Sequence, residues 1–405
     1  MTIEEILAMP EVERKIYYLK KGRKTEQPNA HALYNDWNPN KHEIVIDEEK
    51  YPKIKITTQP EKRITDPTTR KEYVEPAVRK EVDPNRIALP IEQDIVNIQT
   101  AFTVGTEPVL DCQPDQSEES LLSTLKQVFK KNKLKYQNKK VVRAWLAEQE
   151  VAEYWYVVKD DGFWAKLKRK ISGIFGKSKP EYRLKSAIWS PFRGDKLYPF
   201  FNDQGDLVAL SREYKKKDLN DVEITCFMTI TKDMVYQWEL TSNWTDKGSF
   251  AHGFKKMPVI YMYRPEAYCE KIKSLRVRLE KLLSNYADCI DYHFFPILML
   301  FGNVENFSGE FKNRVVELTG QGANAQYLTW SQVPDTVKFE VETLLSQIYG
   351  LTNTPRISFD SLKGTGNAVS GVTFDYVFMS PIAFAYTSVN NLAGWESGFD
   401  GCLNF

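Results

Sequence analysis

The most regular hydrophobic pattern in the chain runs from Pro265 to Phe295. Its apolar positions recur at alternating steps of four and three residues, beginning with Tyr268, Ile272, Leu275, Leu279, Leu282 and Tyr286. A period of 3.5 residues is typical of a helix that packs lengthwise on another helix. Pro265 is tolerated in a first helical turn, and Pro296 stops the helix. Because charged residues fill the flanks, the pattern predicts one long helix with a single apolar seam.

The chain before this helix changes character near Asn85. Residues 1–16 have the pattern of a short amphipathic helix at most, and residues 20–82 are rich in Lys, Glu, Pro, Thr and Asn. Such a segment buries little apolar surface, so we expect residues 1–84 to form an extended arm. After Asn85 the helical period returns, and it predicts a helix that carries Ile91, Ile95 and Ile98 on one face.

Two further helices are predicted at 121–131 and 139–153. Residues 182–240 then show four or five β segments at hairpin spacing, separated by turn residues. Segments at this spacing predict an antiparallel sheet, and a last strand at 259–263 leads to the long helix. The fold class predicted from these elements is α+β.

The chain after Pro296 alternates once more between strand and helix patterns. Short β runs occur at 297–301, 314–318 and 326–330, with a turn predicted at Gly320-Gln321-Gly322. A second helix follows, with apolar residues at Val337, Val341, Leu344, Leu345 and Ile348, and it ends at Gly350. Beyond it lies a polar loop at 352–366.

Composition narrows the class of protein without defining its function. The 405 residues include 55 Lys+Arg and 54 Asp+Glu, so no basic excess predicts tight wrapping of nucleic acid. Five widely spaced cysteines imply no disulfide framework. The N-terminus lacks a signal-peptide pattern, and the longest apolar run, 294–301, is too short to cross a bilayer. We expect a soluble intracellular protein.

The sequence predicts no active site. The four histidines are scattered, which argues against a metal cluster or a histidine-based triad. Gly176-Lys177-Ser178 resembles the tail of a phosphate loop, but Ile171 stands where the first glycine belongs and a basic helical pattern precedes it. We therefore expect no catalytic residue, cofactor or metal. An enzyme with an unrecognised site stays a rival hypothesis that turnover by the isolated chain would support.

A basic amphipathic stretch at 163–177 leaves two interpretations open. Phe163, Trp164 and Leu167 share one helical face with further apolar residues, and lysines and arginines fill the other face. This pattern is typical of a helix that lies on a membrane surface or docks on an acidic protein. The interpretation that we favour is a helical excursion between two strands, at 159–180, that packs on its own sheet. A peripheral membrane or scaffold protein is the alternative function.

The order of these elements resembles the portal proteins of tailed bacteriophages, in the branch typical of long-tailed phages of Gram-positive bacteria. Three stretches carry the resemblance: NRIALPIEQDIVNIQTAFTVGTEP, HGFKKMPVIYMYRPE and LTNTPRISFDSLKGTGNAVSG. The resemblance covers roughly residues 85–378, and the order and spacing of the three stretches are more specific than any one of them. The resemblance implies a ring-forming, non-enzymatic protein.

The resemblance also implies a division of the chain. After the arm, the wing would be 85–264, the first stem helix 265–295, the clip 296–332, the second stem helix 333–351, and the tunnel loop 352–366, with 367–405 returning to the wing. The loop residues nearest DNA would be Lys363, Gly364, Thr365, Gly366 and Asn367. Clip residues would be Arg314, Glu317 and Gln321. The six seam residues of the long helix, from Tyr268 to Tyr286, would pack between subunits.

The partners implied are further copies of the chain, in a ring that is usually dodecameric, and double-stranded DNA passing without sequence specificity. The terminase large subunit, head completion or adaptor proteins, capsid and scaffold would bind the ring. The location would be the virion vertex, and the host cytoplasm during assembly. After 378 the family usually continues into a helical crown, but Pro381, Gly394, Gly398 and Gly401 interrupt here. We therefore expect an absent or truncated crown, as in a degenerate prophage copy.

Overall fold

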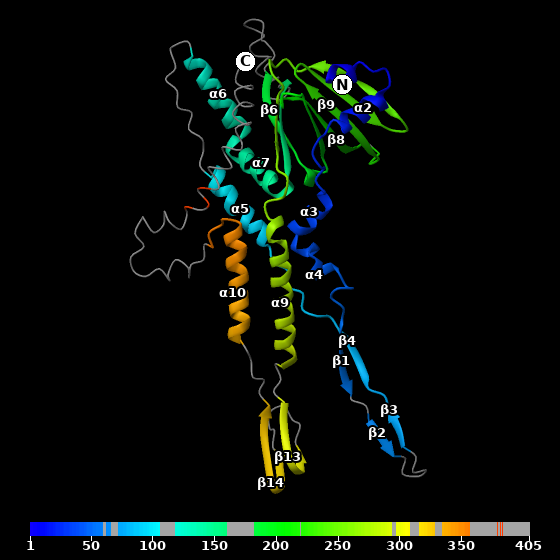
Figure 1. The fold of residues 1–405 in the computed structure, drawn as a ribbon, viewed down its shortest axis with the longest axis vertical. Helices are drawn as coiled ribbons and strands as arrows, with labels where there is room; N and C mark the ends of the chain where they lie inside the picture. Colours follow the sequence, from blue (N-terminus) through cyan, green and yellow to red (C-terminus); the bar gives the residue numbers. More distant parts are fainter. Residues whose placement is uncertain are drawn as a thin grey trace, which may run out of the picture. The chain divides into compact units, whose positions relative to one another are not determined.

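The computed structural model describes residues 1–59, 62–65, 72–105, 118–159, 182–218, 220–293, 297–307, 316–328 and 334–356, together with Met379, Pro381 and Ala383. The chain divides into two compact units. The first unit comprises 1–38, 90–272 and 349–405, and the second comprises 39–89 and 273–348. Helices and antiparallel strands occur in both units, which confirms the α+β class (Figure 1).

The first unit combines helices with two antiparallel sheets. Its helices are α1 (Ile3–Leu7), α2 (Val12–Lys21), α3 (Ala30–Trp37), α5 (Ile91–Val104), α6 (Glu119–Asn132) and α7 (Leu134–Glu148). Its strands are β5 (Glu150–Lys159), β6 (Tyr182–Trp189), β7 (Lys196–Phe201), β8 (Leu207–Lys217), β9 (Glu223–Thr231), β10 (Met234–Leu240), β11 (Trp244–Ala251) and β12 (Val259–Tyr263). One sheet has the order β11-β10-β9-β8-β7, and the other has the order β12-β5-β6.

The five-stranded sheet of this unit is buried on both faces. Leu210 of β8 belongs to a core shared with the three-stranded sheet, and its neighbour Ala209 belongs to a second core beneath α1 and α2. In β9, Met228 belongs to the shared core and Phe227 belongs to the core beneath α1 and α2. Successive side chains of a strand point to opposite faces, so the two apolar residues in a row supply one to each core.

The N-terminal residues differ from the extended arm that the composition predicted. Ile3, Ile6, Ile16 and Leu19 of α1 and α2 are buried in the second core. Thr2 caps α1, since its hydroxyl accepts from the Glu5 N–H and the Glu5 carboxylate accepts from the Thr2 N–H. A short amphipathic helix was expected within residues 1–16, but the extended arm expected after it is wrong for residues 17–46, which are largely helical.

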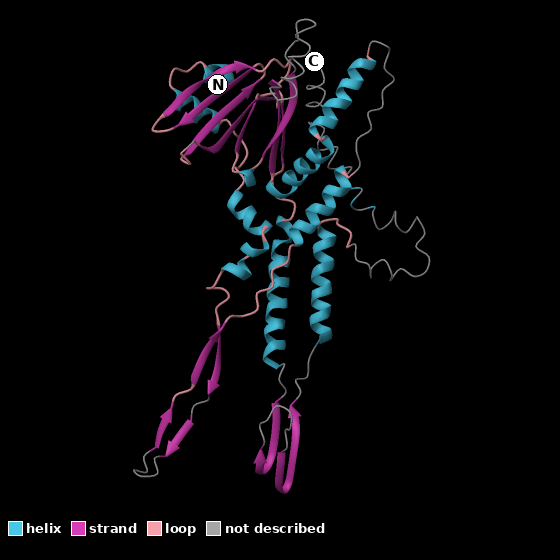
Figure 2. Ribbon diagram, turned by 180° about the vertical axis from the view of Figure 1, so that it is seen from behind, coloured by secondary structure: helices cyan, strands magenta, loops and turns pink. Residues whose placement is uncertain are grey.

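In its described residues, the second unit contains two longer helices, a short helical segment and three two-stranded sheets. Its helices are α4 (Glu43–Ile46), α9 (Lys273–His293) and most of α10 (Pro334–Leu351), with a 3₁₀ turn η1 (Pro39–Lys41). Its strands are β1 (Ile54–Gln59), β2 (Lys62–Thr65), β3 (Glu72–Glu75), β4 (Val78–Val82), β13 (Ile297–Phe307) and β14 (Val316–Leu328). The helices α9 and α10 run alongside each other in both views (Figures 1 and 2).

The long helix begins later than the hydrophobic period predicted. Residues 265–269 form a turn, η3 (Glu270–Ile272) follows, and α9 starts at Lys273. The Tyr268 N–H donates to the Leu146 carbonyl at 2.9 Å. An amide bonded to another element cannot enter a helical ladder, so a tertiary contact delays the helix that Pro265 was expected to begin.

The ribbon between α9 and α10 is a two-stranded antiparallel hairpin of β13 and β14 (Figure 2). The turn predicted at Gly320-Gln321-Gly322 lies inside β14. Phe301 pairs with Asn324 and Asn303 pairs with Thr319, so four residues of β14 oppose one residue of β13. The glycines therefore belong to a bulge and not to a reversal of the chain.

The other ribbon consists of strands β1 to β4, and its first and last strands pair with each other. The strands β1 and β4 pair antiparallel, and β2 and β3 pair antiparallel within the same excursion (Figure 2). Each is a separate two-stranded sheet among the described residues. The expectation of an extended conformation holds locally, but here the chain doubles back and pairs with itself.

Candidate functional site

The helix α9 carries most of the seam that the sequence singled out, and only part of that seam is buried. Ile272 and Leu279 are fully buried, and Tyr268 is 4% exposed. Leu275, Leu282 and Tyr286 are half-buried. Tyr268 and Ile272 lie before the first residue of α9, in the first unit. Packing between subunits at these six positions stays a prediction.

The most deeply buried positions of α9 include polar side chains, two of which are charged residues that the hydrophobic pattern placed on its flanks. Arg276 and Glu280 are each 1% exposed, and Ser284 is 2% exposed. These residues follow one another at steps of four, so they lie on one face of the helix. The signal was present as a polar stripe beside the apolar seam, but charges at helical spacing are usually solvated.

A segment that we call the strap, residues 85–89, explains this polar face. It runs along α9 in the opposite direction, and every second backbone N–H of the strap donates to a side chain of α9. The three bonds are Leu89 N to Glu280 Oε1 at 2.9 Å, Ile87 N to Ser284 Oγ at 2.9 Å, and Asn85 N to Asp288 Oδ1 at 2.7 Å. Two residues of extended chain advance about 6.6 Å, and four residues of helix advance about 6 Å, so the two repeats match.

The N-terminal end of the strap is held by further bonds. Asn85 Nδ2 donates to Asp291 Oδ2 at 2.6 Å, which adds a second bond at the C-terminal end of α9. Arg86 Nη1 donates to the Val45 carbonyl at 2.9 Å, and its Nη2 donates to the Tyr51 carbonyl at 2.8 Å. The strap therefore joins the long helix to the segment that follows α4.

Glu280 is the centre of this arrangement. His42 Nδ1 lies 2.6 Å from Glu280 Oε1, and Arg276 Nη1 lies 3.4 Å from Glu280 Oε2. The side chains of His42 and Glu280 are 0% and 1% exposed. A buried carboxylate is tolerated only when cations and donors surround it, as they do here. The cluster thus fixes the residues before α4 to the middle of α9.

A second polar junction lies in the first unit, where the chain leaves α10. The buried Gln99 of α5 donates from Nε2 to the Thr352 carbonyl at 3.1 Å, the Asn353 carbonyl at 3.0 Å and Thr354 Oγ1 at 2.9 Å. The hydroxyl of Tyr268 also donates to the Thr352 carbonyl. Asn353 has a φ of 47°, a left-handed conformation that asparagine tolerates after a helix.

We call residues 352–354 and the side chains that bind them the loop base. It fixes the chain immediately before most of the predicted tunnel loop. Thr352 is fully buried, and Thr354 is 5% exposed. Donors from two elements, α5 and the turn before α9, converge on three consecutive residues. The sequence analysis assigned Tyr268 to the seam and did not single out Gln99, because one glutamine on a helix gives no pattern.

Several predicted site residues lie outside the described part of the chain. They are Lys363, Gly364, Thr365, Gly366 and Asn367 of the tunnel loop and Arg314 of the clip. Glu317 and Gln321 lie in β14. The basic amphipathic stretch at 163–177 is also outside the described residues, so docking on a membrane or an acidic protein stays a prediction.

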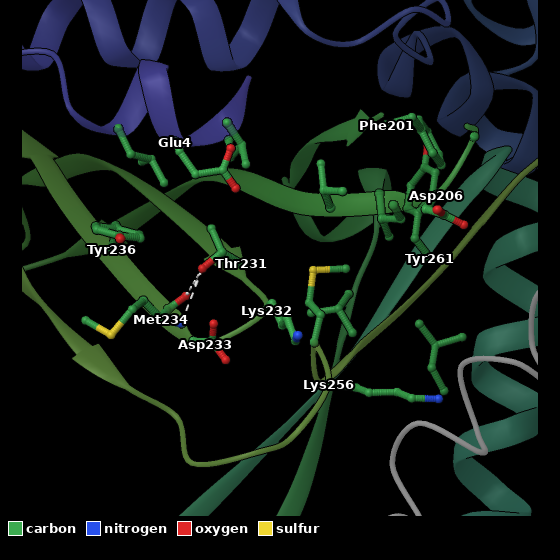
Figure 3. A pocket seen from close by; sticks show the side chains of 18 of the residues that line it. Glu4, Phe201, Asp206, Thr231, Lys232, Asp233, Met234, Tyr236, Lys256 and Tyr261 are labelled. Atoms are coloured by element: carbon green, nitrogen blue, oxygen red, sulfur yellow. Dashed lines mark hydrogen bonds between the residues drawn. The ribbon is translucent and has the colours of Figure 1, made fainter. Parts of the chain in front are cut away.

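A groove of about 1020 Å³ opens at one end of the first unit (Figure 3). Residues of α1, the β7–β8 turn, the β9–β10 turn and the start of β12 line it. Its charged groups include Glu4, Asp206, Asp233, Lys232 and Lys256, all of them exposed. Solvent-exposed charges of both signs are not the desolvated groups that acid–base chemistry requires.

The strongly perturbed carboxyl groups of the first unit serve structural contacts. Burial raises the pKa of Glu148 and of Glu153 to about 7. Burial also raises the pKa of Glu150, against the opposing effect of Arg23, whose Nη1 lies 2.7 Å from Glu150 Oε2. The Phe192 N–H donates to Glu148 Oε2 at 2.7 Å. These groups hold separate elements together and do not converge on one cavity.

Two further searches covered the described residues. They contain no group of three or more His, Cys, Asp or Glu side chains placed to hold a metal ion. None of their helices combines the length and the apolar character that a membrane span requires.

The fold and the two polar junctions define a class of structural protein, in which two helices flank a small β hairpin and polar contacts fix the ends of the helices. A family model described as "Phage portal protein, SPP1 Gp6-like" matches residues 40–380. The chain therefore belongs to this family and is a bacteriophage portal protein, a virion component with a role in genome packaging. A comparison with curated proteins found no match.

Proposed function

We propose that this chain is one subunit of a ring at a single vertex of the capsid, through which double-stranded DNA is packaged and later ejected. The observation that carries the proposal is the family match over residues 40–380, which includes α9, the β13–β14 hairpin, α10 and the loop base. In this proposal the ring is a dodecamer, of the branch typical of long-tailed phages of Gram-positive bacteria.

Each element has a role in the proposed ring. The helices α9 and α10 are the stem, and the wing comprises most of the first unit. The β13–β14 hairpin is the clip, which would bind the terminase large subunit during packaging and head completion proteins afterwards. Residues 352–366 form the tunnel loop. Capsid and scaffold proteins would bind the outside of the ring during assembly in the host cytoplasm.

The strap and the loop base support a mechanical role for the stem, in which its helices keep their positions under force. A conduit through which DNA is driven must keep its stem helices in register while loops respond to the duplex. Hydrogen bonds are directional, so a strap bonded at 280, 284 and 288 resists sliding along α9. The Gln99 contacts fix the start of the proposed tunnel loop. Movement of that loop would therefore not unwind the end of α10.

The charge balance of the chain suits a passage that does not grip its cargo. Each phosphate contact made by a Lys or Arg strengthens binding and makes it dependent on salt. With 55 Lys+Arg against 54 Asp+Glu, the chain has no general excess of cations for such contacts. We expect weak, sequence-independent DNA binding, with Lys363 at the loop tip as the nearest cation.

The first experiment is native mass spectrometry together with negative-stain imaging of the purified full chain. Rings with a central hole and roughly a dozen subunits are the expected result. A packaging assay then compares rings of the Lys363→Ala variant with wild-type rings. Lys216→Ala is the matched control, because Lys216 lies on β8 of the proposed wing. A chain that stays monomeric over the whole accessible concentration range would contradict the proposal.

A further inference from the structure

The ribbon formed by β1 and β4 has two chemically different faces. Ile54 pairs directly with Val82 and Lys55 pairs with Glu81, so these pairs lie on opposite faces. One face carries two ion pairs, Lys55–Glu81 at 3.7 Å and Lys53–Asp83 at 3.2 Å. Along β4 the other face carries Val78, Lys80 and Val82, which alternate with Arg79 and Glu81.

The apolar face of this ribbon is exposed in the isolated chain. Val78 is 51% exposed, Ile54 is 39% exposed and Val82 is 38% exposed. An isolated two-stranded hairpin is marginally stable in water, and its free edges favour association with another chain. Because the apolar residues gather on one face, a partner surface that covers this face would stabilise the ribbon.

The helix α10 presents a surface that is complementary to this face. Phe339 is 70% exposed, the largest exposed fraction among the large hydrophobic residues described. Asp335 precedes it by four residues and Glu342 follows it by three, so the three side chains form one stripe along the helix. Asp335 and Glu342 are both exposed, and among the described residues neither has an ion-pair partner.

The two stripes have matching order and length. The ribbon has a cation between two apolar residues, and the helix has an aromatic residue between two carboxylates. Val78 to Val82 spans about 13 Å along a strand, and Asp335 to Glu342 spans about 10 Å along a helix. Lys80 can therefore reach a carboxylate while the valines cover Phe339. Each stripe complements the other and not itself.

We propose that the β1–β4 ribbon of one copy docks on α10 of a neighbouring copy, with Val78 and Val82 against Phe339 and Lys80 against Asp335 or Glu342. Two different surfaces in one contact make a heterologous interface, which closes into a ring when the rotation between copies permits. This inference rests on the proposed ring and names one of its subunit contacts. The β1–β4 ribbon is then an inter-subunit clasp.

Charge reversal tests the contact without disturbing the fold. Lys80→Glu places like charges together, so we expect the concentration at which half of the chain is in rings to rise about tenfold or more. Arg79→Glu is the matched control, since the same change one residue away lies on the opposite face, and it leaves assembly unchanged. Phe339→Ser removes the apolar half of the contact and weakens assembly independently.

Mixing two single variants separates a contact between copies from one within a copy. Lys80→Glu and Glu342→Lys chains each assemble poorly alone, but a mixture restores alternating rings, because every contact then pairs opposite or wild-type charges. Native mass spectrometry with one variant isotopically labelled reads the composition. Rescue by the double variant Lys80→Glu/Glu342→Lys without rescue by mixing would place the contact inside one chain and overturn the inference.

Failure of the clasp and failure of the proposed function give different results. If the Lys80→Glu and Phe339→Ser chains formed rings as well as the wild-type chain does, the clasp would be overturned and the portal role would stand. A wild-type chain that never forms rings would overturn both. Circular dichroism and thermal unfolding of each variant confirm that the exposed substitutions leave the fold unchanged.

Discussion

The five-stranded sheet of the first unit, the proposed wing, and the helix α9, part of the proposed stem, are stabilised in different ways. The sheet is buried on both faces by apolar side chains such as Leu210 and Phe227. The buried part of α9 also carries Arg276, Glu280 and Ser284. Glu280 and Ser284 accept from strap amides, and Glu280 also contacts His42 and Arg276. Apolar burial contributes free energy without direction, whereas hydrogen bonds at each turn fix one register.

The contrast suggests a division of labour. A unit that folds on its own apolar cores loses stability in proportion to the apolar surface and volume that a substitution removes, wherever in those cores it lies. A stem held by a buried charge cluster cannot lose one member without leaving another uncompensated. We therefore expect substitutions in the wing to lower the overall free energy of unfolding. Substitutions in the stem should detach the strap while the wing stays folded.

The largest effect is expected in the wing core. Phe227 is 1% exposed, and its ring lies 5.8 Å from that of Tyr198 and 6.1 Å from that of Trp238. Phe227→Ala should lower the free energy of unfolding by about 4 kcal/mol, through lost burial and the cavity left behind. Chemical denaturation followed by tryptophan fluorescence measures it. Phe250→Ala, at a side chain 49% exposed, is the control and should cost far less.

The next effect is expected at the centre of the stem cluster. Glu280→Gln keeps the shape of the side chain but removes the charge that faces Arg276 and His42, and we expect a cost of about 3 kcal/mol. Hydrogen exchange should accelerate at the Leu89 and Ile87 amides and in α9, and stay slow in β8 and β9. Glu270→Gln, at an exposed residue, is the control. Equal acceleration in the wing would contradict the division between the two regions.

The wing was largely predictable from the sequence. Turn residues and hairpin spacing predicted one antiparallel sheet over 182–240. The strands β7 to β10 pair there in one sheet, but β6 pairs with β5 in the other sheet. The predicted helix at 139–153 ended too late, since α7 ends at Glu148 and β5 begins at Glu150. The mixture of apolar and polar residues at 146–153 fits the end of a helix as well as the start of a strand, so periodicity alone does not place that boundary.

The stem was predictable as a helix but not in how it is held. The apolar seam located α9, and the heptad spacing correctly singled out Leu279 as buried. The strap, however, is recognised only when residues 85–89 are placed beside residues 280–288, about two hundred positions apart. Backbone donors have no sequence signature, so no local pattern reveals that Ser284 binds the Ile87 amide.

A pH-dependent effect of intermediate size tests whether an ionisable group in the wing behaves differently from the stem cluster. Burial raises the pKa of Glu153 to about 7, against a weaker lowering by a hydrogen bond from Ser186. The unfolded chain ionises this carboxyl more readily, so the folded state loses stability as the pH rises from the unfolded pKa through about 7.

Glu153→Gln should therefore raise the free energy of unfolding by about 2 kcal/mol near pH 8 and change it little near pH 4. Thermal unfolding of both proteins across this range measures the difference. Glu4→Gln, at an exposed residue, is the control and should show no such pH dependence. A stabilisation of equal size at both pH values would show that ionisation is not its cause.

The smallest effect sharpens the comparison most, because it removes a single bond of the strap. Ser284 Oγ accepts from the Ile87 N–H at 2.9 Å, and the serine is 2% exposed. Ser284→Ala leaves that amide without its acceptor, at a cost of about 1 kcal/mol, while the bonds at Glu280 and Asp288 remain. Exchange of the Ile87 amide should accelerate about fivefold, and that of Leu89 should change less. Ser346→Ala, at an exposed serine of α10, is the matched control. If the Leu89 amide accelerated as much as the Ile87 amide, the strap would open as one unit, and its register would depend on all three bonds together.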